Sequence, residues 1–363
     1  MSWVGLADRH GAAFDLTGLS NRPRRHPVKL AERPNAIAHR GTIMLEANIA
    51  QFTVPRALIS HALGASFSLK IAFGTQNKLD FSLSMRDASW EERLPLHISE
   101  ELQVVRVTFA WDWATRAAVL SVFEPRSQHL AQCLLPSPRA IPWAALRELI
   151  HDAPEMCRAN NISFVALSRA FEATGAMPGL ARRTILQTTN GPRQIGDISA
   201  GDLVLAYDGA PRRVLASVKR LMPARGSFMP HDLRAPYLGL ERDLVVSGET
   251  LVELHGADVE YLLGVERVLA QANQVGNKQA PFSAAEQATI CYHQLIFEDV
   301  ELMDAGVGLA SLNLGAALPD GLSGATTLWA DLGNACRQTP HPITPYPLAR
   351  PYEVVTLNAA RAA

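Results

Sequence analysis

Short segments in which apolar and polar residues alternate dominate the first half of this 363-residue chain. Alternation places every second side chain on one face of a strand, so it is typical of half-buried β-strands. Gly, Asn, Asp or Pro bounds each segment, and no helical period intervenes, which favours an antiparallel sandwich or barrel. The segments are Thr42–Ile49, Ser66–Phe73, Leu79–Met85, Leu102–Phe109 and Ala118–Phe123. We therefore expect a β-sandwich over residues 41–172.

Two neighbouring segments carry a more specific pattern. Val105–Asp112 contains Trp-Asp at its end and turns into Ala118–Pro125. This pair resembles the back-sheet strands of concanavalin A-like jelly rolls, the fold of lectin, laminin-G and glucanase-type domains. The resemblance implies a mainly β, jelly-roll-like N-terminal half, and it makes a glycan or cell-surface molecule a candidate ligand.

Trp111, Asp112 and Trp113 are the candidate ligand-binding residues of this half. Aromatic faces stack on pyranose rings, a carboxylate binds hydroxyl groups, and residues two apart on a strand share a face. Packing in the core or at its rim is the alternative, and it is the commoner role of aromatic residues at strand ends. Glycosidase activity is not expected, because no strand offers the pair of closely spaced carboxylates that it needs.

The second half has a different organisation, which begins after the small, turn-forming segment Glu172–Gly179. The patterns of Thr184–Gly191 and Ile195–Gly209 predict strands, with turns at Asn-Gly and Asp-Gly. With Asp243–Val252 and the stretch from Tyr292 to Leu312, they resemble, in order, the opening, middle and closing segments of Hedgehog/intein (Hint) domains. The resemblance implies a Hint-like β domain over residues 177–315, as in bacterial Hint proteins where this module follows a sandwich-like region.

The residues that carry Hint chemistry are only partly present. Hint autoprocessing starts when a first Cys or Ser attacks the preceding carbonyl, and a Thr-x-x-His pair polarises and protonates the scissile bond. The expected nucleophile position falls at Gly179, and the expected histidine aligns with Thr250, which cannot exchange protons as imidazole does. Ser247 keeps the Thr/Ser position, and His293 matches one histidine of the closing strand. Thr184 remains as a displaced nucleophile, a poor one without a nearby base.

These matches leave four predicted segments: an N-terminal arm (residues 1–40), the sandwich (41–172), the degenerate Hint-like domain (177–315) and a tail (316–363). The tail contains Arg350–Val354, which also resembles the sequence that follows such modules. Protein splicing is not expected, because no terminal Asn followed directly by Cys, Ser or Thr comes after the closing strand.

Three functions fit these segments. The leading hypothesis is a non-enzymatic binding or structural protein, with the sandwich as ligand-facing module and the Hint fold as scaffold. The first alternative is a self-cleaving protein that uses the non-standard groups Thr184, Ser247, Thr250 and His293. The second alternative is an adhesive or structural subunit of a larger assembly, such as a phage-like particle or a surface appendage.

Charge and composition limit the partners. The net charge of −1 lacks the basic footprint of a nucleic-acid-binding protein. No window has the ~18 consecutive apolar residues of a membrane span. The first residues lack the pattern of a cleavable signal peptide, so a cytoplasmic location is the default expectation, with export or association with a particle left open. The four cysteines have no CxxC spacing, and Cys291 beside His293 is interpreted as structural, so no metal or cofactor is expected.

Overall fold

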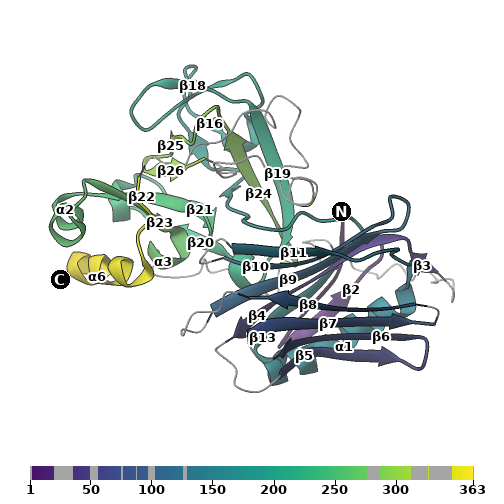
Figure 1. Ribbon diagram of the computed structural model, residues 1–363. Helices are drawn as coiled ribbons and strands as arrows, with labels where there is room; N and C mark the ends of the chain where they lie inside the picture. Colours follow the sequence, from purple (N-terminus) through teal and green to yellow (C-terminus); the bar gives the residue numbers. More distant parts are fainter. Residues whose placement is uncertain are drawn as a thin grey trace. The chain divides into compact units, whose positions relative to one another are not determined.

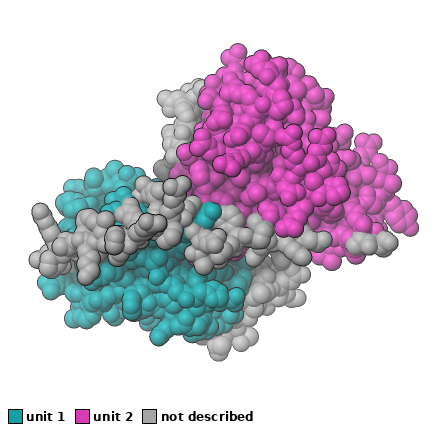
Figure 2. Space-filling model, turned by 180° about the vertical axis from the view of Figure 1, so that it is seen from behind, with its two compact units in different colours: residues 1–176, 284–289 teal, residues 177–283, 290–363 magenta. Residues whose placement is uncertain are grey.

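A computed structural model describes residues 2–19, 36–49, 56–74, 77–86, 88–96, 103–125, 129–275, 287–311, 326 and 346–362. The chain divides into two compact units (Figure 2). Unit 1 comprises Met1–Ala176 with Ala284–Thr289, and unit 2 comprises Met177–Ser283 with Ile290–Ala363.

Unit 1 is a two-layer antiparallel sandwich (Figure 1). The seven-stranded sheet has the order β11 (His129–Leu134), β10 (Ala117–Glu124), β9 (Gln103–Asp112), β4 (Arg40–Ile49), β13 (Ile162–Ser168), β1 (Trp3–Asp8) and β2 (Gly11–Phe14). The four-stranded sheet has the order β5 (Arg56–Leu63), β6 (Phe67–Gly74), β7 (Lys78–Met85) and β8 (Ala88–Pro95). A separate two-stranded sheet pairs β3 (Ile37–Ala38) with β12 (Ile141–Pro142). The predicted mainly β sandwich is therefore confirmed.

One core fills the space between the two large sheets. Alternate residues of β9, such as Val107 and Phe109, face alternate residues of β7, such as Phe81 and Leu83. The rings of Phe81 and Phe109 lie 5.2 Å apart across this core. The two-residue period seen in the sequence thus comes from strands that each turn one face toward the partner sheet.

A single long helix closes one side of the sandwich. Helix α1 (Trp143–Asn160) begins after Pro142, whose missing N–H is no loss at a helix start. It ends at Asn161, which adopts a left-handed conformation with φ 55°. Its buried face, including Leu146 and Leu149, packs against β13, β1, β2 and β5.

The N-terminal residues differ from the prediction of an arm over residues 1–40. Trp3–Asp8 forms β1, in which all six residues are buried, and it pairs with β13 on one side and β2 on the other. The prediction was wrong for this stretch because the Arg- and Pro-rich residues that follow outweighed one short apolar run. Residues 20–35 lie outside the described part of the chain.

Unit 2 is built from shorter strands in four sheets. The five-stranded sheet has the order β19 (Ala216–Pro223), β24 (Thr289–Ile296), β14 (Leu180–Ala181), β21 (Leu244–Ser247) and β20 (Pro230–Leu233). The four-stranded sheet has the order β23 (Arg267–Gln271), β22 (Leu251–His255), β26 (Gly308–Ala310) and β25 (Leu302–Asp304). The pairs β15 (Ile185–Leu186) with β16 (Arg193–Gln194) and β17 (Leu203–Leu205) with β18 (Pro211–Arg213) complete it.

The connections in unit 2 contain short helical turns and small helices. They are η1 (Ile195–Asp197), η2 (Gly226–Phe228), η3 (Tyr237–Gly239), α2 (Ala257–Leu263) and α3 (Ala272–Val275). The glycines of the predicted Asn-Gly and Asp-Gly turns, Gly191 and Gly209, have φ values of 92° and 81°. Such positive φ angles favour glycine, so these two residues fix the turns.

The predicted tail (316–363) ends in a packed helix. Helix α6 (Pro351–Ala362) places Val354 and Leu357 in a small core with Val259 of α2 and Val268 of β23. Helix α6 is thus part of unit 2, and its apolar side chains at helical spacing form the face that packs there. Residues 312–325 and 327–345 lie outside the described part. No helix of the described residues has the length and apolar character needed to cross a lipid bilayer.

Candidate functional site

The turn between β21 and β22 holds the first residues of unit 2. Ser247 donates its backbone N–H to the carbonyl of Gly179 at 2.7 Å, and its Oγ donates to the carbonyl of Met177 at 3.0 Å. The same Oγ accepts the backbone N–H of Glu249 at 3.2 Å, and the Thr250 N–H closes the turn onto the Ser247 carbonyl. These hydrogen bonds attach the turn to the Met177–Gly179 segment, which leads into the five-stranded sheet.

Thr250 and Glu249 hold the same segment. The Thr250 Oγ1 accepts the Gly179 N–H at 3.0 Å and donates to the Gly179 carbonyl at 3.0 Å. The Glu249 Oε2 accepts the N–H of Met177 at 2.7 Å. Thr250 is fully buried and Glu249 nearly so. These side chains thus give partners to the buried N–H groups of Met177 and Gly179, and Thr250 adds a second donor to the Gly179 carbonyl.

Gly179 lies against Tyr292 of β24. A Cβ atom at position 179 would collide with the Cβ of Tyr292 and lie 3.0 Å from its Cγ. The tyrosine ring is buried, and its hydroxyl donates to the Phe228 carbonyl at 2.8 Å. Burial, with a smaller contribution from Glu249, raises the pKa of Tyr292 well above its ordinary value. With β24 in this position, only glycine fits where a nucleophilic side chain was expected.

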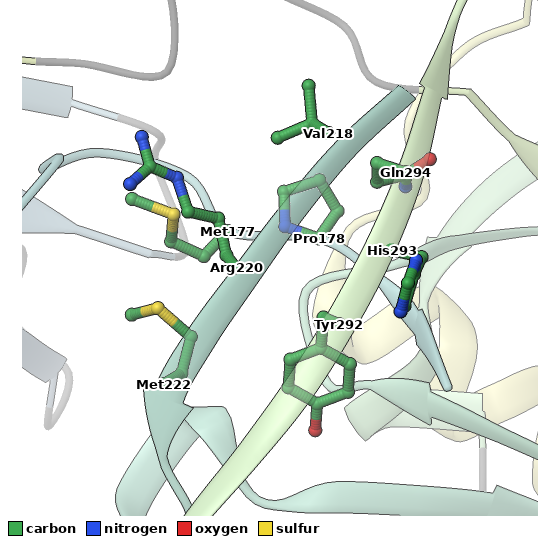
Figure 3. Close-up of a pocket in the computed structure, with 8 residues that line it drawn as sticks. All are labelled: Met177, Pro178, Val218, Arg220, Met222, Tyr292, His293 and Gln294. Atoms are coloured by element: carbon green, nitrogen blue, oxygen red, sulfur yellow. The ribbon is translucent and has the colours of Figure 1, made fainter. Parts of the chain in front are cut away.

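A small hollow beside this segment is drawn in Figure 3. Its volume of about 10 Å³ is close to that of one water molecule. Its walls come from Met177, Pro178, Val218, Arg220, Met222, Tyr292, His293 and Gln294. The hollow beside Pro178 therefore has room for about one water molecule.

His293 lies on β24, the strand beside Gly179, and is not part of the Ser247–Thr250 turn. In the register of β14 with β24, Leu180 is paired with His293, and Tyr292 lies opposite Ala181. The His293 side chain leaves β24 on the side away from Met177 and Met222 (Figure 3). Burial, and then the nearby Lys219 and Arg182, lower the pKa of His293.

Thr184 makes its backbone hydrogen bonds outside the Ser247–Thr250 turn. Its N–H donates to the Ala181 carbonyl at 2.9 Å, and its own carbonyl accepts the Ile195 N–H at 2.8 Å. The structure thus brings together Gly179, Ser247 and Thr250 among the predicted residues, and it adds Glu249 and Tyr292. The sequence offered a signal for both additions, because Glu249 lies inside the Ser-x-x-Thr segment and Tyr292 precedes His293.

The three ligand-binding candidates of unit 1 have separate environments. Trp111 is fully buried, and its Nε1–H donates to the Ala38 carbonyl at 3.0 Å, so it belongs to the core and not to a binding face. Trp113 is 50% exposed, and its ring lies 5.2 Å from that of His39. The expectation that both tryptophans share a face is wrong, because β9 ends at Asp112 and the alternation stops there.

Asp112 holds the turn that follows β9. Its Oδ1 accepts the N–H of Ala114 at 3.0 Å and the N–H of Thr115 at 3.4 Å. Its Oδ2 lies 3.3 Å from the Nε of Arg40. This carboxylate is therefore engaged in the turn, and it fixes the position from which Trp113 projects.

The sequence profile of the Hint domain family matches residues 178–311. Unit 2 contains a Hint domain. The start of the match, at Pro178, coincides with the segment held by the Ser247–Thr250 turn. Ser247 and Thr250 thus contact the first residues of the matched range.

Searches for similar solved structures also return inteins and a laminin domain. The chain is similar to the MchDnaB-1 intein, with 18% identity, a TM-score of 0.25, and coverage of 37% of this chain and 99% of that one. It is also similar to the gp41-1 intein, with 15% identity, a TM-score of 0.24, and coverage of 38% of this chain and 100% of that one. For the LG1-3 region of the laminin α2 chain the identity is 12% and the TM-score is 0.24, with coverage of 38% of this chain and 23% of that one. The chain thus spans about a quarter of the length of that laminin region. A comparison with curated proteins finds no match.

Proposed function

We propose that this chain is a binding or structural protein whose Hint domain has lost self-cleavage, with the sandwich as its ligand-facing module. The observation that carries the proposal is the packing of Gly179 on Tyr292. A nucleophile at position 179 needs at least a Cβ atom, and the Tyr292 Cβ already occupies that space. The site is therefore both without a nucleophile and closed to one.

The hydrogen bonds of Thr250 support the same proposal. Its hydroxyl is used by the N–H and the carbonyl of one residue, Gly179. A threonine hydroxyl does not exchange protons near neutral pH, so it cannot replace imidazole as the acid for a leaving amide. The turn that would activate a scissile bond acts here as a clamp on the chain.

Intact-mass analysis of the purified full chain tests this proposal. We expect one species near 39.5 kDa that is unchanged by added thiol or hydroxylamine, which release thioesters and esters. Fragments with new ends between Pro178 and Thr184 would establish self-cleavage instead. In that case Thr184→Ala serves as the matched variant, because loss of the fragments would identify Thr184 as the displaced nucleophile.

The ligand-facing role of the sandwich rests on Trp113. This ring is half exposed beside His39, while Arg40 and Asp112 form an ion pair next to it. An exposed aromatic face with polar neighbours suits stacking on a sugar ring. We expect binding to a glycan array that Trp113→Ala abolishes and that Leu134→Ala, a change at another exposed apolar side chain of unit 1, leaves intact. No binding above background would remove the carbohydrate version of the proposal.

The assembly alternative draws on exposed apolar side chains of unit 2. Tyr261 of α2 is 89% exposed, and Tyr352 and Val355 of α6 are 60% and 67% exposed. An assembly that uses these residues would migrate as a large species in native lysate, and the double variant Tyr352→Ser, Val355→Ser would reduce its size. A monodisperse monomer in native lysate would count against this alternative.

A further inference from the structure

Two side chains on the outer part of β24 form a thiol–imidazole pair. Cys291 and His293 are two residues apart on the strand, so they share a face, and the Sγ of Cys291 lies 3.7 Å from the Nε2 of His293. His293 is buried, and its lowered pKa keeps the imidazole neutral near pH 7. A neutral imidazole nitrogen at this distance can accept the thiol proton while the sulfur attacks an electrophile.

Two cations flank this pair. Strand β24 lies between β19, which contains Lys219, and β14, which Arg182 directly follows in the chain. Burial raises the pKa of Cys291, and these two cations act against that rise. The side chain of Arg182 lies over Gly196, where a Cβ would collide with it, and its Nη2 is 3.7 Å from the Oδ1 of Asp197. The chain therefore holds Arg182 in place beside the thiol.

The other two described cysteines, like Cys291, have a pKa raised by burial, but their charged neighbours differ. Burial raises the pKa of Cys133 to about 11, and Glu92 adds to the rise. Burial raises the pKa of Cys157 to about 12; Asp8 adds to the rise and Arg158 acts against it. Cys133 and Cys291 are both partly exposed, so exposure does not separate them. What separates them is a carboxylate beside Cys133 and an imidazole with two cations beside Cys291.

We propose that Cys291 is a reactive thiol that exchanges with low-molecular-weight disulfides bearing carboxylates, such as glutathione disulfide. The Nε2 of His293 takes the thiol proton, and the Sγ attacks one sulfur of the disulfide. The Sγ–S bond forms as the S–S bond breaks, and the departing thiolate takes the proton back from the imidazolium. The products are a mixed disulfide on Cys291 and one free thiol.

The charges around Cys291 select the class of disulfide. Lys219 is exposed and the Arg182 side chain is 67% exposed, so both can attract a carboxylate before the sulfur atoms meet. In the described part of the chain no three His, Cys, Asp or Glu side chains are arranged to hold a metal ion. The proposed exchange at Cys291 does not depend on whether the Hint domain cleaves itself.

The experiment treats the full chain at pH 7.5 with glutathione disulfide or with cystamine, a disulfide that carries two ammonium groups, and maps each cysteine by peptide mass. We expect glutathione disulfide to modify Cys291 several-fold faster than Cys133 or Cys157. Cystamine should lose that preference for Cys291. Modification of Cys133 as fast as Cys291, or the same preference with both reagents, would overturn the proposal.

Two variants separate the roles of the base and the cations. His293→Gln should slow the modification of Cys291. Its rate should then rise with pH as it does for a thiol without a base, because Lys219, Arg182 and Asp197 are the charged groups that remain nearby. The double variant Arg182→Glu, Lys219→Glu should shift the preference toward cystamine. Cys133→Ser is the control, and it should leave the rate at Cys291 unchanged. An unaltered pH profile in His293→Gln would remove the imidazole from the proposal.

Discussion

The two units use different interactions to hold their strands. In unit 1 the strands of the two large sheets are four to ten residues long, most of them eight or more, and they enclose one continuous core. In unit 2 most strands have two to five residues, and the buried apolar side chains fall into separate smaller clusters. The comparison teaches that one large apolar core organises the long strands of the sandwich, whereas the short strands of unit 2 depend more on the turns that join them.

The turns of unit 2 contain side-chain bonds to the backbone. The Thr188 Oγ1 donates to the carbonyl of Gly191 at 2.6 Å, and the Asp202 carboxylate accepts both the Ser199 N–H and the Nη1 of Arg193. The Ser247–Thr250 turn follows the same rule on a larger scale. Side-chain bonds of this kind fix the backbone of the turns between the short strands.

Removal of a large core side chain should therefore have its greatest effect in unit 1. Trp111→Ala deletes a fully buried ring that lies against Phe109, and it should cost about 3–5 kcal/mol of unfolding free energy. Trp113→Ala, the matched change two residues on, should cost under about 0.5 kcal/mol because half of that ring is already in water. Urea unfolding followed by circular dichroism measures both, and equal costs would contradict the burial of Trp111.

Addition of one methyl group should have the next largest effect, in unit 2. Gly179→Ala forces a Cβ onto Tyr292, and overpacking of this kind costs about 1–3 kcal/mol. Gly11→Ala is the control, because a Cβ there meets no atom within 4 Å. Urea unfolding again provides the measurement. A neutral Gly179→Ala would mean that β24 moves aside readily, and the closed-site proposal would fail with it.

This difference between the units also explains what the sequence could predict. The strands of unit 1 were predicted because apolar and polar residues alternate in them over enough positions to be recognised. Strand β1 was missed because its six apolar-rich residues were averaged with an Arg- and Pro-rich stretch. The positions of Ser247 and Thr250 near Gly179 were predicted from ordered Hint-like segments. Their hydrogen bonds were not, because strands such as β14, with two residues, carry no period of their own.

The burial of Trp111 and the close approach of Tyr292 to Gly179 could not be predicted from the sequence, for another reason. Trp111 and Trp113 differ only in where β9 ends, a boundary that the pattern does not fix to one residue. The approach of Tyr292 to Gly179 depends on the spacing of two strands about 110 residues apart in the chain. Such non-local contacts leave no periodic trace in one sequence.

Loss of a single hydroxyl tests the clamp in unit 2. Thr250→Val keeps the shape of the side chain but leaves the buried N–H and carbonyl of Gly179 without this partner, at a cost of about 1–3 kcal/mol. Thr356→Val on α6 is the matched control, because its hydroxyl bonds an exposed helical carbonyl, that of Tyr352. Thermal unfolding of both variants measures the difference. If both changes have the same small effect, the Thr250 bonds do not hold the segment.

The smallest expected effect is a pH dependence of unit 2 that unit 1 need not share. His231 of β20 is buried against Gly248, and burial lowers its pKa from the ordinary value of 6.5. The unfolded ring takes up a proton as the pH falls through 6.5, while the folded ring stays neutral until its lowered pKa is reached. The stability that this ring contributes is therefore complete above pH 6.5 and is lost as the pH falls below it. Unfolding free energies measured at pH 7.5 and at steps down to pH 5.5 should fall less steeply for His231→Gln than for the parent chain, and equal slopes would show that His231 takes no part in this dependence.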